Sequence, residues 1–88
     1  MSVIVRQAAA GTTESSDVYV EIAPAEEIRI DIESVVKHQF GDSVRRSVED
    51  VLKEQGVDGA EVRLVDRGAL DCVIRARVET AVLRGKGE

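Results

Sequence analysis

Residues 10–22 read AGTTESSDVYVEI, and the rest of the chain is organised around this stretch. Its first eight residues are mostly small or hydroxyl-bearing, and its last five alternate with the period of a half-buried strand. Residues 3–10 are mostly apolar or small, which predicts a strand before the turn. We therefore expect a β-hairpin with Glu14-Ser15-Ser16-Asp17 at its tip, and a buried face made of Val18, Val20 and Ile22.

Two further strands are expected after the hairpin. Pro24 ends the second strand, because proline cannot donate to a sheet ladder. Residues 28–33 alternate isoleucine with charged residues, so Ile28, Ile30 and Ile32 share one face of a third strand. Residues 61–64 predict a fourth, short strand, and a turn follows at residues 66–68.

Between the third and fourth strands the hydrophobic period becomes that of a helix. Apolar residues spaced four apart mark one face of this helix: Val36, Phe40, Val44, Val48 and Leu52. The helix starts at Ser34 or restarts at Asp42 after Gly41, because Asp is a good N-cap, and both starts stay open. Gly56 followed by Val57 predicts a left-handed C-cap.

Residues 69–84 fit a strand or a helix by periodicity. We predict a helix, because the segment is long and rich in Ala, Leu and Arg, and we expect the last four residues to fray. These elements predict the α+β class. The chain is then a single domain, residues 1–88, whose small, mostly antiparallel sheet consists of the N-terminal β-hairpin plus two further strands and is covered by two helices.

Composition disfavours several function classes. Twelve Lys and Arg against 17 Asp and Glu give a net charge of −5, and two aromatic residues offer no stacking platform, so no nucleic-acid partner is expected. One histidine, His38, and one cysteine, Cys72, leave no zinc cluster and no Ser/His/Asp site with its usual motif. We therefore expect no metal and no catalytic residue. We also expect no membrane partner and a cytoplasmic location, because no signal peptide, long apolar run or cysteine framework is evident.

Two serines are candidate attachment sites for a covalently bound group. Ser43 lies in FGDSV at residues 40–44, which resembles the site where ordinary acyl and peptidyl carrier proteins attach phosphopantetheine at the start of a helix. Those carriers are all-helical bundles, whereas this chain has strand signals. Asp42 and Ser43 are also explained as a helix N-cap and the residue that follows it.

Three other blocks resemble the acyl carrier subunit, or gamma chain, of citrate lyase over nearly the whole chain. They are AGTTESSD at residues 10–17, KHQFGD at residues 37–42 and DRGALDC at residues 66–72, with RAR at residues 75–77 just beyond. Thr13 stands where that family typically has Leu, and Arg67 where it often has Lys. Neither departure touches Ser15.

The resemblance implies a phosphoprotein without catalytic residues, in which Ser15 is joined through a phosphodiester to 2′-(5″-phosphoribosyl)-3′-dephospho-coenzyme A. The thiol of this arm would carry acetyl and citryl thioesters between a transferase (alpha) and a lyase (beta) subunit during citrate fermentation. A prosthetic-group transferase and an acetylating ligase are further implied partners. A tethered arm keeps its cargo at high effective concentration at both active sites.

The residues around Ser15 suit this role. Its hydroxyl lies on a predicted tip with small neighbours, which leaves room for a modifying enzyme. Ser15 and Ser16 could instead only satisfy the turn, and chemistry alone does not choose between them. Glu14 and Asp17 flank the site and are candidates to position the hydroxyl. Three arginines are candidates to meet the arm's phosphates: Arg67, Arg75 and Arg77.

Cys72 is expected to be a core residue rather than the acyl-carrying thiol, because its neighbours Leu70, Val73 and Ala76 are apolar. Two alternatives to the citrate lyase role stay open. One is a carrier subunit of a related citramalate lyase or malonate decarboxylase. The other is a protein-interaction module that is never modified.

Overall fold

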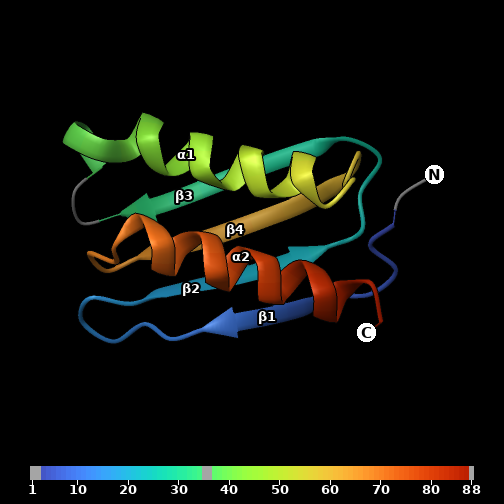
Figure 1. Ribbon diagram of the computed structural model, residues 1–88, viewed down its shortest axis with the longest axis horizontal. Coiled ribbons are helices and arrows are strands. Elements are labelled where there is room, and N and C mark those ends of the chain that lie inside the picture. Colours follow the sequence, from blue (N-terminus) through green and yellow to red (C-terminus); the bar gives the residue numbers. More distant parts are fainter. Residues whose placement is uncertain (1–2, 35–36, 88) are drawn as a thin grey trace.

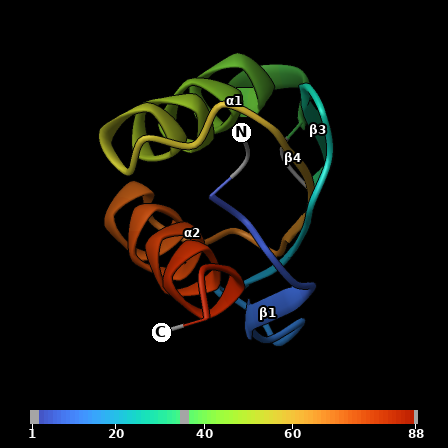
Figure 2. The ribbon, with the colours of Figure 1, turned by 90° about the vertical axis from the view of Figure 1, so that its right-hand side faces the viewer.

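The computed structural model describes residues 3–34 and 37–87, and for residues 37–41 it describes the backbone only. Four strands form one sheet, and two helices cover one of its faces (Figures 1 and 2). In chain order the elements are β1 (Ala8–Gly11), β2 (Val18–Ala23), β3 (Ile28–Ser34), α1 (Lys37–Glu54), β4 (Ala60–Asp66) and α2 (Asp71–Gly85). This is the α+β architecture predicted from the sequence.

The sheet has the strand order β1-β2-β4-β3. β1 and β2 pair antiparallel with Ala10 opposite Val20, which confirms the predicted hairpin. β2 and β4 are also antiparallel, whereas β3 and β4 run parallel. Parallel neighbours need a crossover connection, and α1 provides it between β3 and β4 (Figure 1). The sheet is therefore mostly antiparallel, as expected.

The core lies between the sheet and the two helices. Val18, Val20 and Ile22 are buried, as their alternation predicted. In β3 only Ile30 is buried, because this strand lies at the sheet edge, and Ile28 is 39% exposed. The helices contribute buried residues from one face each: Val44, Val48, Val51 and Leu52 from α1, and Ile74, Val78, Ala81 and Val82 from α2.

Both ends of the chain differ from expectation. The first strand begins at Ala8 rather than at residue 3. The preceding segment instead buries Ile4 and ties the amides of Val5 and Arg6 to the carbonyl oxygen of Gly85, at 2.9 and 3.2 Å. Gly85 is itself buried at the end of α2, so the prediction that the last four residues fray is wrong for Gly85.

The helix boundaries settle two open points. α1 begins at Lys37 and continues through residues 41 and 42, so neither Ser34 nor Asp42 starts it. The predicted core contributions of Val36 and Phe40 lie outside the described part of the chain. At the other end, Gly56 has a φ of 71°, and the amide of Val57 donates to the carbonyl of Leu52 at 2.9 Å. This Schellman-type ending confirms the predicted left-handed C-cap.

Residues 69–84 were ambiguous by periodicity, and the structure confirms the helix. α2 runs parallel to α1 and antiparallel to β4, and it lies over β1 and β2 (Figure 1). The start of α2, the β1–β2 turn and the start of α1 therefore lie at one end of the sheet. This end contains both candidate serines.

Candidate functional site

The β1–β2 turn, residues 12–17, is joined to the loop between β4 and α2, residues 67–70. The amide of Ser16 donates to the carbonyl of Arg67 at 2.9 Å, and the amide of Arg67 donates to the carbonyl of Asp17 at 2.9 Å. These two bonds extend the β2–β4 ladder beyond its last pair, Val18 and Asp66. The turn is thus fixed to the body of the domain rather than projecting freely.

Asp17 organises the turn through its carboxylate. It accepts hydrogen bonds from the Thr12 hydroxyl at 2.6 Å and from the Val18 amide at 2.8 Å. Three contacts lower the pKa of Asp17 from 3.8 to about 2. The hydrogen bond from Thr12 has the largest effect, followed by the Val18 amide and then the guanidinium of Arg77. Asp17 is therefore ionised at neutral pH and acts as an acceptor only.

Arg77 on α2 completes this arrangement. Its Nε donates to Asp17 Oδ1 at 3.3 Å, and its Nη2 donates to Asp17 Oδ2 at 3.2 Å. The Asp17 side chain is only 16% exposed, so the pair is partly shielded from water. A fork of this kind fixes both the position and the orientation of a carboxylate. Arg77 thereby holds the turn and is not a free cation.

Two residues have a positive φ here: Gly11, which ends β1, and Ser16 in the turn. Gly11 has a φ of 89°, and a Cβ built on it would lie 1.9 Å from the carbonyl oxygen of Val18, so this position requires glycine. Ser16 has a φ of 66°, which is uncommon for a residue with a side chain. Its amide bond to Arg67 helps to hold it there.

Ser15 and Ser16 are the central residues of the tip, closed by a hydrogen bond from the Asp17 amide to the Glu14 carbonyl at 3.1 Å. Both serines and Glu14 are exposed. Within residues 3–34 and 37–87, neither serine hydroxyl makes a hydrogen bond; Thr12 and Asp17 satisfy the turn instead. The hydroxyl of Ser15 is thus exposed and not needed to hold the turn.

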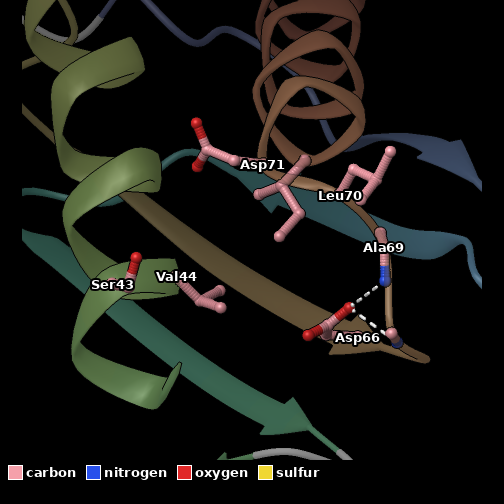
Figure 3. Close-up of a pocket in the computed structure, with 8 residues that line it drawn as sticks. Ser43, Val44, Asp66, Ala69, Leu70 and Asp71 are labelled. Atoms are coloured by element: carbon pink, nitrogen blue, oxygen red, sulfur yellow. Dashed lines mark hydrogen bonds between the residues drawn. The ribbon is translucent and has the colours of Figure 1, made fainter. Parts of the chain in front are cut away.

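Ser43 lies in a different setting. It is the seventh residue of α1, and its side chain is exposed at the rim of a cavity of about 360 Å³ (Figure 3). Asp42 is inside the helix, so the N-cap interpretation of this pair is wrong. Ser43 also does not open its helix, as the attachment serine does in the carriers that the FGDSV stretch resembles.

The other candidate cations differ in their partners. Arg75 binds Asp71 at 2.9 Å and Asp50 at 3.1 Å, so it links α1 to α2, and the Asp50 bond is the main cause that raises its pKa above the usual value. Arg67 is exposed, and its side chain makes no hydrogen bond or ion pair with any described residue. Of the three arginines, Arg67 is the one whose guanidinium is available to a ligand.

Cys72 is exposed, so the expectation that it belongs to the core is wrong. The buried stripe of α2 begins at Ile74 and continues at Val78. A helix turns by about 100° per residue, which places a residue two positions before Ile74 on a different side of the helix. The apolar neighbours of Cys72 in the sequence did not reveal this phase.

Two buried polar side chains that the sequence did not point to, Asp66 and Ser47, lie near the start of α2. Asp66 is buried, and its Oδ1 accepts hydrogen bonds from the amides of Gly68 and Ala69 at 3.0 and 2.9 Å, as Figure 3 shows. The buried hydroxyl of Ser47 bonds to Asp71, and this bond is the main cause that lowers the pKa of Asp71. An Asp two residues before Gly is a recognisable turn signal, whereas the Ser47–Asp71 contact between helices has no local signal.

The described residues support neither a metal site nor a membrane-spanning helix. In residues 3–34 and 37–87, no group of three His, Cys, Asp or Glu side chains could hold a metal ion. No helix in this part of the chain has the length and apolar character needed to cross a membrane.

Comparison with known proteins gives a consistent result. Residues 5–85 match the family described as malonate decarboxylase delta subunit (MdcD). The chain is 52% identical to a citrate lyase acyl carrier protein of Yersinia enterocolitica over 97% of its length and 90% of the relative, and 49% identical to one of Escherichia fergusonii over 92% and 86%. Its fold matches a chain of a Pseudomonas malonate decarboxylase hetero-tetramer with a TM-score of 0.80, at 20% identity, over 92% of this chain and 84% of that one.

Proposed function

This chain belongs to the family of citrate lyase acyl carrier proteins, and on this premise we propose that it is the acyl carrier subunit of a citrate lyase, with its prosthetic group attached to Ser15. Carrier proteins of this kind are non-catalytic subunits of larger complexes. The proposed group is 2′-(5″-phosphoribosyl)-3′-dephospho-coenzyme A, and the proposed location is the cytoplasm. The proposed partners are the transferase (alpha) and lyase (beta) subunits, the prosthetic-group transferase and the acetylating ligase.

The single observation that carries the proposal is the state of Ser15. It stands at an exposed tip whose geometry is held by Asp17, Thr12 and Arg77, while its own hydroxyl has no bond to any described residue. A modifying enzyme can therefore reach the hydroxyl without breaking the turn. The same turn gives the attached arm a fixed origin on the domain.

The residues near Ser15 fit a phosphate-containing group. The Ser15 oxygen would attack the phosphorus of an activated form of the group. The new phosphodiester bond would form as the P–O bond to the donor's leaving phosphate breaks and the serine proton is lost. The backbone of Arg67, whose exposed guanidinium has no described partner, pairs with the tip beside Ser15. Arginine suits phosphate because its planar fork donates several hydrogen bonds. When bound, the group supplies the thiol that carries the acyl cargo. The chain itself anchors and positions that group.

A malonate decarboxylase carrier is the second candidate, favoured by the matched family and by the shared fold. Sequence identity favours citrate lyase, because the citrate lyase relatives are 46–52% identical whereas the malonate decarboxylase chain is 20% identical. An acyl-transfer assay with purified transferase subunits and competing citrate and malonate acceptors separates the two. We expect citrate to replace the acetyl group on the carrier thiol, with release of acetate. Formation of the malonyl thioester alone would assign the chain to the second complex.

The attachment is tested by the intact mass of the protein purified from a host that is fermenting citrate and contains the modifying enzymes. We expect the wild type and Ser43→Ala to carry an adduct of the mass of the proposed group, and Ser15→Ala to have the unmodified mass. Ser43→Ala is the matched control because Ser43 is also exposed. An unmodified wild type would contradict the carrier role, and an adduct on Ser15→Ala would contradict the site.

A further inference from the structure

A cavity of about 360 Å³ opens between α1 and the β4–α2 loop (Figure 3). Its apolar walls come from Val44 on α1 and Ile74 on α2, which are both buried, and from Ala69 and Leu70 in the loop. Leu70 is 71% exposed. The volume lies within the range of about 300 to 1,000 Å³ that is typical of small-molecule pockets.

The cavity is joined directly to the turn that contains Ser15. Its loop wall follows Arg67, whose backbone makes the two hydrogen bonds to Ser16 and Asp17. The buried Asp66 carboxylate holds this wall in place through the amides of Gly68 and Ala69. An arm rooted at Ser15 therefore starts one loop away from the cavity and can fold back along that loop.

The charges around the cavity select which part of such an arm can enter. The two charged residues among its described lining are the carboxylates Asp66 and Asp71. Arg75 pairs with Asp71 from outside the lining, and no Lys or Arg is among the described lining residues. Carboxylates repel phosphate groups, so the phosphates of the arm belong outside, on the side of Arg67. The uncharged, partly apolar end of the arm fits the apolar walls.

We propose that this cavity holds the uncharged, thiol-bearing end of the arm rooted at Ser15 whenever the arm is not in a partner's active site. This inference rests on the proposed function. Tethering makes weak binding sufficient, because a short linker gives an effective concentration of about 1 mM, so that a millimolar site is roughly half occupied. Occupancy protects the thiol or its neutral acetyl thioester from solvent. A citryl thioester has free carboxylates, which Asp66 and Asp71 disfavour, so the citryl form is released.

The experiment measures how fast the arm's thiol reacts with N-ethylmaleimide in the loaded protein. A Cys72→Ser background makes this thiol the only one present, because Cys72 is the single cysteine of the chain. The reference is the tryptic peptide of residues 7–29 carrying the same arm, which has no cavity. With the cavity half occupied or more, the folded protein reacts about twofold or more slowly than the peptide.

Two variants on α1 test where the protection arises. Ser43→Phe places a large side chain at the cavity, and we expect it to raise the reaction rate to that of the peptide. Glu49→Phe adds the same side chain at an exposed position that does not line the cavity, and we expect the wild-type rate. As an independent readout, the methyl resonances of Val44 and Ile74 shift when the arm is attached to the wild type.

The outcomes separate this inference from the proposed function. Mass spectrometry first establishes whether Ser15 carries the arm, and a protein without the arm in a competent host overturns both. An arm on Ser15 whose thiol reacts as fast as in the peptide, with the Val44 and Ile74 methyl groups unmoved, overturns only the cavity as its resting place. If the thiol is protected equally well in Ser43→Phe and in Glu49→Phe, that result also overturns the cavity as the resting place of the arm.

Discussion

Arg77 holds Asp17 with two hydrogen bonds, of 3.3 and 3.2 Å, across 60 residues of sequence. The pair connects the middle of α2 to the turn between β1 and β2. Since Asp17 also accepts from Thr12 and from the Val18 amide, one carboxylate fixes the whole turn on which Ser15 stands. The position of Ser15 is therefore set by the packing of α2 on the sheet.

The first prediction concerns pH. The folded-state pKa of Asp17 is about 2, below its ordinary value of 3.8, so folding favours the ionised form. Its contribution to stability is fully present above about pH 4 and is lost as the pH falls toward 2. We expect Asp17→Asn to remove this part of the pH dependence. Urea unfolding midpoints of both proteins between pH 2 and 7 check it, and parallel curves below pH 4 would contradict it.

The second prediction concerns the two glycines that border this end. Gly11→Ala would place a Cβ 1.9 Å from a backbone oxygen, and we expect a loss of about 3 kcal/mol or more in unfolding free energy. Gly68→Ala is the matched control. Its φ of 94° is also positive, but nothing lies within 4 Å of the added atom, so the expected loss is about 1 kcal/mol. Equal losses in urea denaturation would show that the close approach at Gly11 does not matter.

The third prediction concerns the loop that walls the cavity. Asp66→Ala leaves the amides of Gly68 and Ala69 and the hydroxyl of Ser34 without this acceptor, and we expect a loss of about 3 kcal/mol. Asp66→Asn keeps one carbonyl oxygen for the two amides, so the expected loss is about 1 kcal/mol. Urea denaturation measures both variants. An alanine variant as stable as the asparagine variant would contradict the role of these bonds.

The fourth prediction concerns Cys72. Its exposed position on α2 means that it reacts with a water-soluble aromatic disulfide reagent in the native, unmodified protein. We expect one equivalent of thiol to react at the rate seen in urea, within about threefold, because burial is what slows buried thiols. A thiol that becomes reactive only after denaturation would restore the core assignment that the structure contradicts.

Much of the fold follows from local patterns. The alternation of Val18, Val20 and Ile22 and the Gly56-Val57 ending each needed only neighbouring residues, and the structure confirms both. The N-terminal strand begins at Ala8 rather than at residue 3, because a run of mostly small apolar residues does not distinguish a strand from a segment held by one buried side chain. Here Ile4 is that side chain, and its environment is created by α2.

The site was predictable only in part. Small and hydroxyl residues predicted an exposed tip, and the structure places Ser15 there. The sequence marked Asp17 as a candidate to position the hydroxyl and Arg77 as a candidate phosphate contact. It did not predict that the two residues pair, because they meet only after α2 packs on the sheet. The same holds for Cys72, whose exposure depends on the rotational phase of a helix. Long-range pairing and helix phase are tertiary properties that neighbouring residues do not encode.

The claim that Ser15 is the covalent root of the arm is tested most directly by locating the adduct in a tryptic digest of the protein from a citrate-fermenting host. Residues 7–29 form one peptide, whose only serines are Ser15 and Ser16, and residues 38–45 form another, whose only serine is Ser43. Backbone fragmentation between Ser15 and Ser16 assigns the mass. We expect it on Ser15; an adduct on Ser16 or on Ser43 would contradict the account.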